Sequence, residues 1–454
     1  MHAYYTVHEA VESIGFGRFQ WLLSAAAGFS WIADSMEIML LSLLVPSLVC
    51  EWNISVYEQA LCTMCMFAGW MLFSSVWGAV CDRFGRRTGL FITSVMGCVF
   101  GIASACSPSF TWFVIFRTLV GVAMGGCSQS VTIMMEFLPT SKRSAGACML
   151  AIRAATTVLI AMAITPWLGW RGVVVFCSLP LGIFAVIAVF WLPESARYYV
   201  TRGETAKATA VLRRIAAING GSLPEGDLVT DAEPTDENKC MALLAAGRRR
   251  LTIFVWICWA GATFSYYGLT LTTTKMFSST DECHGGDPHR VINATAHCSP
   301  LTSGDYVDML ISSVAELPGL AVAFLLLDRI GRKSTISLML AVFAAANIVM
   351  YFCLSRALIV VFLFIARAMI NGAAQSLYIY TPEVYPTTMR AIGVGMGSTF
   401  GRLGAIFTPT IAQILADWNM GAAMLIYGGV GLICSAVALL FPVETAGREL
   451  KDVQ

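Results

Sequence analysis

The sequence predicts an all-α membrane protein with twelve transmembrane helices in two six-helix lobes and both termini in the cytoplasm. Three observations support this fold: the apolar composition, the number of long apolar runs, and a set of landmarks that recurs in the two halves. Of the 454 residues, 57% are hydrophobic and 13% are charged, whereas soluble domains carry about 25% charged residues. Lipid is therefore expected to be the solvent for much of the chain.

The apolar runs set the number of membrane crossings. A helix that crosses the hydrocarbon core needs about 20 mostly apolar residues. Twelve such runs lie at 19–46, 57–80, 88–106, 110–135, 145–166, 170–192, 250–276, 304–327, 334–353, 357–381, 389–415 and 419–442.

Lysine and arginine in the short loops predict the orientation, because cytoplasmic loops are enriched in both. One side carries nine of them: Arg83, Arg86, Arg87, Lys142, Arg143, Arg329, Arg332, Lys333 and Arg390. The other side carries Arg171 and Arg356. The first side is therefore expected to face the cytoplasm.

The runs divide the chain into an N-terminal lobe (1–192), a cytoplasmic inter-lobe loop (193–249) and a C-terminal lobe (250–454). Within the inter-lobe loop, apolar residues at helical spacing predict a short amphipathic helix over 204–219, which Gly220 ends. It is either a helix on the inner face or a simple strap between the lobes.

An outer loop is expected at 277–303. Its Cys283 and Cys298 predict a disulfide, although Cys50 is a third cysteine on the outer side and leaves the pairing open. In the same loop, Asn293 lies in a glycosylation sequon on the outer face.

Composition and histidine placement exclude several function classes. A net charge of +1 and the lack of a basic stripe argue against a nucleic-acid partner. All five histidines lie outside the apolar runs, and no nucleophile motif is present, so neither an enzyme, a metal site nor a cofactor is expected. No pore-loop segment interrupts the helices, which disfavours a channel.

Charged motifs recur at a nearly constant offset and predict two related lobes. The first-half set consists of Asp82, Arg83, Gly85, Arg86, Glu136 and Arg143. The second-half set consists of Asp328, Arg329, Gly331, Arg332, Glu383 and Arg390. Such clusters are expected to gate access from the cytoplasm. A simple excess of positive charge explains the basic residues, but not the repeated Asp-Arg-x-Gly-Arg order.

These motifs, together with the Pro-Glu-Ser that follows residue 192, resemble the major facilitator superfamily. Segments 5–10, 14–20, 33–40, 264–268, 315–319 and 378–380 resemble the branch of synaptic-vesicle-related, plant organic cation/carnitine and niacin transporters. The resemblance implies a secondary transporter with a central solute site. The chain departs from the branch in the run 145–166, where Arg153 stands in an Ala/Thr-rich stretch.

Acidic residues inside the apolar runs are candidate proton-coupling sites, because an ionisable side chain in a membrane is costly unless a cavity or partner uses it. Asp34 and Glu37 share one helix face and repel each other, which favours proton binding. Glu316 is a second candidate. The alternative is that each acid forms a static ion pair with an arginine from the set Arg117, Arg153, Arg367 and Arg402.

Arg402 is the candidate anchor for the solute, because a planar guanidinium holds a carboxylate with two parallel hydrogen bonds. The resemblance implies an arginine at this place in organic-anion carriers and an aspartate in organic-cation carriers. Other predicted substrate-binding residues are Arg153, Tyr266, Tyr267, Gln375 and Tyr378, although tyrosines in membrane helices often only pack.

We therefore expect a monomeric transporter that works by alternating access and moves a small organic ion, coupled to protons. The favoured substrate is a small carboxylate such as nicotinate. The alternatives are an organic cation/carnitine transporter and a non-transporting vesicle or receptor-like protein. The host is expected to be the plasma membrane or an intracellular vesicle or vacuole membrane.

Overall fold

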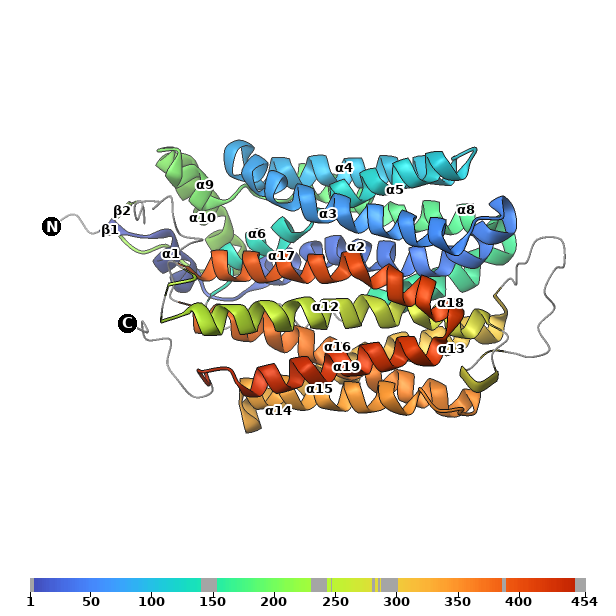
Figure 1. Cartoon of the computed structure of the whole chain (residues 1–454). Coiled ribbons are helices and arrows are strands. Elements are labelled where there is room, and N and C mark those ends of the chain that lie inside the picture. The colour runs from blue at the N-terminus through green and yellow to red at the C-terminus, as the bar shows by residue number, and fades with distance from the viewer. Residues whose placement is uncertain are drawn as a thin grey trace.

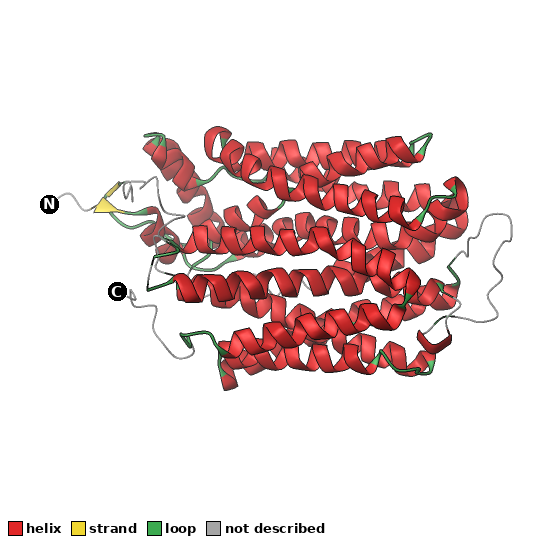
Figure 2. Cartoon of the chain, viewed as in Figure 1, coloured by secondary structure: helices red, strands yellow, loops and turns green. Residues whose placement is uncertain are grey.

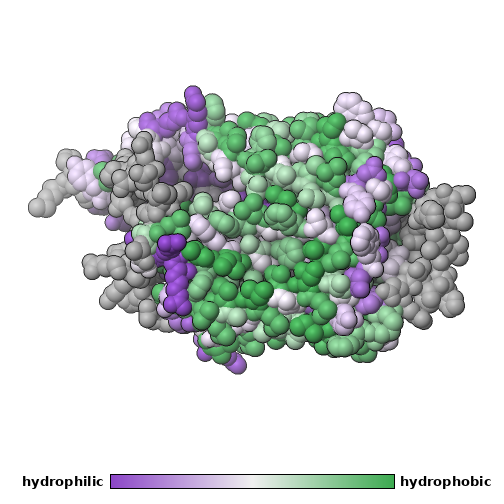
Figure 3. Space-filling view, in the orientation of Figure 1, coloured by the Kyte–Doolittle hydropathy of each residue, from purple (hydrophilic) through white to green (hydrophobic). Residues whose placement is uncertain are grey.

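Helices form nearly all of the described structure (Figure 2). The computed structural model describes residues 4–139, 153–229, 243–245, 247–279, 282–284, 286, 301–385 and 389–445. The long helices lie side by side with their axes roughly aligned, and both termini lie at the same end of the molecule (Figure 1). Hydrophobic residues predominate across the middle of the visible face, and hydrophilic residues gather towards both ends, as expected for a protein that crosses a bilayer (Figure 3).

The N-terminal lobe holds the first six runs. Its helices are α2 (Arg18–Trp52), α3 (Val56–Phe84), α4 (Arg86–Ala105), α5 (Phe110–Met124), α6 (Ser128–Glu136) and α8 (Arg153–Phe190). A turn divides the run 110–135 into α5 and α6. The described parts of the runs 145–166 and 170–192 share α8, which kinks at Gly169, where φ is +62°.

The C-terminal lobe holds the other six runs. Its elements are α12 (Arg249–Ser278), α13 (Ser303–Val314), α14 (Glu316–Ile330), α15 (Arg332–Val349), α16 (Arg356–Val384), α17 (Arg390–Pro409), the π-helical η3 (Thr410–Leu415), α18 (Ala416–Trp418) and α19 (Met420–Leu439). In the described chain, eight helical segments are long and apolar enough to cross a membrane by length and composition alone. Helices α12 and α17 are not among the eight. Both face the other lobe, and their sequences contain polar residues and glycines that lower the hydropathy of these helices.

A small cytoplasmic layer covers the N-terminal lobe (Figure 1). Strand β1 (Tyr4–Tyr5) pairs in parallel with β2 (Asp227–Leu228), beside α1 (Val7–Ile14), α9 (Ala196–Thr201) and α10 (Thr205–Asn219). Helix α10 buries Leu212 and Ile215 and ends at Gly220, where φ is +72°. The inter-lobe helix therefore packs on the N-terminal lobe.

The outer loop requires a correction. The structure bonds Cys283 to Cys353, not to Cys298. The 3-10 helix η2 (Glu282–His284) lies against the turn after α15, where the N–H of Leu354 donates to the carbonyl of Cys283 at 3.2 Å. Cys353 lies at the end of an apolar run, so the sequence prediction counted it as a membrane residue. Cys50 is also disulfide-bonded, and Cys298 and Asn293 lie outside the described residues.

Candidate functional site

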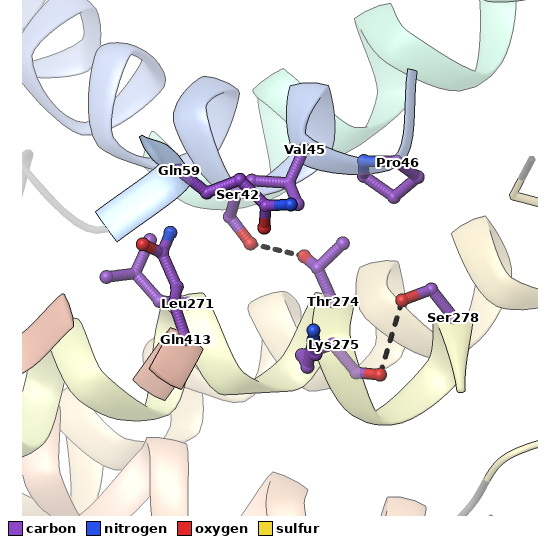
Figure 4. Close-up of a pocket in the computed structure, with 9 residues that line it drawn as sticks. All are labelled: Ser42, Val45, Pro46, Gln59, Leu271, Thr274, Lys275, Ser278 and Gln413. Carbon is purple, nitrogen blue, oxygen red and sulfur yellow. Dashed lines mark hydrogen bonds between the residues drawn. The ribbon is translucent and has the colours of Figure 1, made fainter. Parts of the chain in front are cut away.

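The two lobes meet in the outer half of the membrane region. Ser42 of α2 hydrogen-bonds to Thr274 of α12, and Gln413 Nε2 of η3 donates to Thr63 Oγ1 of α3 at 3.2 Å. Figure 4 shows the side chains of Ser42 and Thr274 pointing toward each other between α2 and α12. The pocket beside them has a volume of about 10 Å³, enough for about one water molecule. An organic solute cannot pass between these residues, and we call the contacts of Ser42 with Thr274 and of Thr63 with Gln413 the outer closure.

Gln413 owes its place to a local feature of the backbone. Residues 410–415 form a π-helical turn directly after Pro409. Such turns widen the helix and often occur at functional sites. The sequence prediction missed Gln413 because a hydropathy pattern does not report a π-turn. Pro409 inside an apolar run was the available signal.

An aromatic and arginine cluster lies further inward, between α3, α12 and α17. We call Phe67, Trp70, Ser74, Tyr267 and Arg402 the central cluster. The Arg402 guanidinium carbon lies 5.2 Å from the Trp70 ring centroid, and Arg402 Nη1 donates to Ser74 Oγ at 3.1 Å. Phe67 stacks on Tyr267 with centroids 5.3 Å apart. The predicted residues Arg402 and Tyr267 thus meet three α3 residues that the sequence analysis did not select.

The central cluster contains donors that have no acceptor. Arg402 is 8% exposed and Trp70 is 8% exposed, yet Arg402 Nε and Trp70 Nε1 make no hydrogen bond. Both atoms are donors only, and buried donors are rarely left unpaired. Among the side chains that the structure describes, no carboxylate forms an ion pair with Arg402; the side chain of Asp34 lies outside this description.

Glu37 is paired with Arg117, and both side chains are fully buried. Glu37 Oε2 accepts from Arg117 Nη1, whereas Glu37 Oε1 and Arg117 Nε and Nη2 have no partner. This is the static pair that the sequence left open as an alternative. The Arg153 side chain, another possible partner, lies outside the described residues.

Glu316 forms the corresponding pair in the C-terminal lobe. Its Oε1 accepts from Arg367 Nη2 at 2.9 Å and from the Tyr266 hydroxyl at 3.1 Å. Glu316 is 1% exposed and Arg367 is 2% exposed. Each predicted coupling acid with a described side chain is therefore neutralised by an arginine of its own lobe.

The remaining predicted substrate contacts lie on α16. Tyr378 packs edge-to-face on Trp259, with ring centroids 4.4 Å apart, and Gln375 is half-buried. Tyr378 is 37% exposed. Their contact with a solute stays a prediction.

The cytoplasmic motifs form two clusters of the same geometry. In the N-terminal lobe, Arg86 Nε lies 2.9 Å from Glu136 Oε1, and Asp82 lies 3.8 Å from Arg86. Glu194 accepts from the backbone N–H groups of Arg86 at 2.7 Å and of Arg87 at 3.2 Å. A carboxylate on the first N–H groups of a helix satisfies orphan donors and complements the helix dipole.

The C-terminal lobe repeats this arrangement. Arg332 Nε lies 3.1 Å from Glu383 Oε2, and Glu444 accepts from the backbone N–H groups of Arg332 at 2.9 Å and Lys333 at 3.1 Å. Gly331 and Gly85 precede the capped helices with φ of +88° and +99°, which glycine adopts without steric cost.

The other predicted gate residues lie around these clusters. Asp82, Arg83, Asp328 and Arg329 are exposed at the cytoplasmic end. Arg143 and the Arg390 side chain lie outside the described residues. The Pro-Glu-Ser segment that contains Glu194 contributed to the family resemblance, but no role was predicted for Glu194 or Glu444.

Two family models match the sequence. Residues 15–282 match the model described as "Sugar (and other) transporter", and residues 303–453 match the model described as "Major Facilitator Superfamily". A Caenorhabditis elegans relative named svop-1 is 46% identical over 99% of this chain and 87% of its own length. The synaptic vesicle 2-related protein of Xenopus laevis is 41% identical (99% and 82%). The organic cation/carnitine transporter 7 of Arabidopsis thaliana is 34% identical (99% and 96%).

Solved structures share the fold. The partially occluded inward-open xylose transporter XylE from E. coli gives a TM-score of 0.72 at 18% identity, over 95% of this chain and 99% of that one. Its inward-open conformation gives 0.71 at 16% identity, over 96% and 99%.

Proposed function

The chain belongs to the major facilitator superfamily and is a multi-pass membrane transporter, not an enzyme, and from this premise we propose that it carries a small organic anion by alternating access. The favoured example is a flat aromatic carboxylate such as nicotinate. The central cluster is the proposed binding site.

The observation that carries this proposal is the pair of unpaired donors, Arg402 Nε and Trp70 Nε1. A buried donor without a partner costs about 1–3 kcal/mol, and a hydrogen bond to a charged group contributes about 1.5–3 kcal/mol. A carboxylate has two acceptor oxygens and could satisfy both donors. Its aromatic ring would find stacking partners in Phe67 and Tyr267, which are already stacked on each other.

We further propose that Glu37 carries the coupling proton. Its pair with Arg117 is sealed from solvent, and three polar atoms of the pair lack partners. Protonation of Glu37 would leave the Arg117 charge uncompensated, so the pair is stable in one protonation state only. A change of this kind can bias two access states differently. Asp34 and Glu316 remain further candidates for the same role.

A second candidate solute is a carnitine-like zwitterion. One relative carries the name organic cation/carnitine transporter, and the rings of the central cluster suit a quaternary ammonium group. Arg402 would then hold the carboxylate of the zwitterion. A third candidate is a non-transporting vesicle or receptor-like protein, in keeping with the synaptic vesicle 2-related relatives. The host membrane would be a vesicle membrane or the plasma membrane.

Uptake into proteoliposomes separates these proposals. Radiolabelled nicotinate and carnitine are compared at acidic and neutral outer pH, with the protein as a purified monomer. We expect nicotinate uptake that rises at acidic pH and falls at least tenfold in Arg402→Ala. Arg171→Ala is the matched control, because Arg171 is an exposed arginine of the outer surface paired with Glu51.

The outcomes are distinct. Carnitine uptake without nicotinate uptake supports the zwitterion proposal. If neither solute enters, or if Arg402→Ala transports as well as the control variant, the anion site proposed here is wrong. If uptake by the unmodified protein is the same at acidic and neutral outer pH, transport is not coupled to protons.

A further inference from the structure

The eighth membrane helix has a one-residue break in its hydrogen-bonding pattern. Helix α13 ends at Val314 and α14 begins at Glu316, whereas Ala315 between them keeps helical dihedral angles (φ −55°, ψ −24°), so Ser303–Ile330 remains one continuous span. Pro318 explains the break, because proline has no N–H to donate to the carbonyl four residues earlier, and its ring clashes with that turn. Sharp bends in long helices occur most often at proline. Glu316 therefore lies beside a point where this helix can bend.

Three side chains hold Glu316 in place at the break. Arg367 Nη2 and the Tyr266 hydroxyl both donate to Oε1, and Asn371 Nδ2 donates to the Glu316 backbone carbonyl at 3.2 Å. Glu316 Oε2 has no partner, and neither do Arg367 Nε and Nη1. The carboxylate has few donors, so the loss of one of them is costly in a buried site.

The internal repeat shows that helix packing does not require this arrangement. Gly319 of α14 faces the Ala368 carbonyl of α16, and Gly69 of α3 faces the Thr118 carbonyl of α5. The two residues of the C-terminal pair each lie 250 positions after their counterparts in the N-terminal pair (319 − 69 = 250 and 368 − 118 = 250). Arg367 follows Arg117 by the same offset.

At this offset, Glu316 corresponds to Met66 and Pro318 to Ala68. Helix α3 is unbroken at that place. The two lobes share the close glycine contact, but only the C-terminal lobe has the acid and the break. These two features therefore serve something other than packing.

Tyr266 connects the break to the central cluster. Tyr266 packs edge-to-face on Tyr267 with centroids 5.3 Å apart, and Tyr267 stacks on Phe67 of the other lobe. A solute that entered between these rings would displace Tyr267 and change the packing of its neighbour Tyr266. The hydroxyl of that neighbour is one of the two donors to Glu316 Oε1.

The outer half of the eighth helix contacts both lobes. Helix α13 contacts α8 of the N-terminal lobe, where the Tyr306 hydroxyl donates to Thr165 Oγ1 at 3.4 Å. Helix α13 also contacts α16, where Arg356 pairs with Asp305 at 2.8 Å and with Asp308 at 2.6 Å. Helix α14 packs on the same helix, which carries Arg367. A bend at Glu316 would therefore move the outer half, together with the outer end of α16, against α8 of the opposite lobe.

We propose that Tyr266 is a positioning residue that couples the central cluster to the outer closure through the Glu316–Arg367 pair at the break in the eighth helix. In the state described here, the hydroxyl holds Glu316 and keeps α13 closed on α8. Displacement of the Tyr266 hydroxyl releases the outer half. The role of the solute as the trigger rests on the proposed function, whereas the link between Tyr266 and the closure does not.

A disulfide reporter tests the link without any solute. Ser42→Cys with Thr274→Cys joins two side chains already in contact across the outer closure. The rate of disulfide formation under mild oxidation, followed by mass spectrometry in the purified protein, measures the closed fraction. Adding Tyr266→Phe is expected to slow this rate at least threefold. Tyr427→Phe is the matched control, because the Tyr427 hydroxyl is buried in the same lobe and is not one of the donors to Glu316.

Equal rates in the Tyr266→Phe and Tyr427→Phe backgrounds would overturn the proposal. If Tyr266→Phe does not yield monodisperse protein, Glu316→Gln is measured in the same way, with the same expected slowing. Pro318→Ala introduces the residue of the N-terminal lobe and should make the rate insensitive to Tyr266→Phe; a threefold slowing that persists there excludes bending at this proline. Nicotinate is then added to the reporter. If nicotinate changes the rate of disulfide formation in every background except Tyr266→Phe, the solute acts as the trigger through Tyr266. If nicotinate changes the rate in no background, only the proposed solute is contradicted.

Discussion

The buried Glu37–Arg117 pair makes a sharp prediction about stability. Both side chains are fully buried, so replacing one partner leaves the other charge in a medium that solvates it poorly. Removing one partner of a buried ion pair costs about 3–5 kcal/mol, whereas replacing both with neutral residues of similar volume is nearly neutral. Glu37→Gln and Arg117→Met should each lower the stability by about this amount. The double variant should be more stable than either single variant.

Thermal unfolding in detergent, followed by tryptophan fluorescence, gives the midpoints of the unmodified protein, the two single variants and the double variant. The exposed outer pair Glu51–Arg171 is the matched control, with a 2.7 Å contact and side chains 37% and 46% exposed. Exposed pairs contribute about 0–1 kcal/mol, so its variants should barely move the midpoint. If the midpoint of the Glu37/Arg117 double variant is lowered by the sum of the two single shifts, the two residues are not energetically coupled and the reasoning is wrong.

Three further predictions address the cytoplasmic cap, the outer disulfide and the π-turn. Glu194→Gln should destabilise the protein by about 1 kcal/mol, because a neutral amide caps the start of α4 less well than a carboxylate; the same change at the exposed Glu204 should not shift the thermal midpoint. Cys353→Ser should free the Cys283 thiol, and a membrane-impermeant maleimide should then label it from the outside; protein that stays unlabelled at this position contradicts the bond. Gln413→Leu removes the hydrogen bond from η3 to α3 and should speed deuterium exchange in the π-helical turn, whereas an unchanged exchange rate would mean that the contact does not hold the turn.

The fold was predictable because the bilayer imposes local rules. Every span needs about 20 apolar residues, and cytoplasmic loops collect Lys and Arg. These rules act on contiguous stretches, so the runs, the orientation and the two lobes could be read from the chain. The family models and the fold of XylE confirm the architecture. The 250-residue offset also relates Arg117 to Arg367, but it does not show which acids these arginines bind.

Several parts of the candidate site could not be predicted, because they depend on the rotation and contacts of helices far apart in sequence. Trp70 lies in an apolar run where an aromatic residue usually faces lipid or the core, and only the contact with Arg402 distinguishes it. The cap by Glu194 depends on a chain segment 108 residues away from Arg86. Cys353 has the same hydropathy whether it is buried in the membrane or bonded to the outer loop.

By itself, the sequence determined the membrane class, the twelve runs, the two-lobe repeat and the presence of costly charges inside the membrane, because the bilayer places these demands on each segment separately. Only the tertiary structure decided how those charges are used: Glu37 with Arg117, Glu316 with Arg367 and Tyr266, and Arg402 over Trp70 without a carboxylate among the described side chains. The physical reason is that a charge in a low-dielectric interior requires a partner, but the chain does not encode in any one segment which neighbouring helix supplies it.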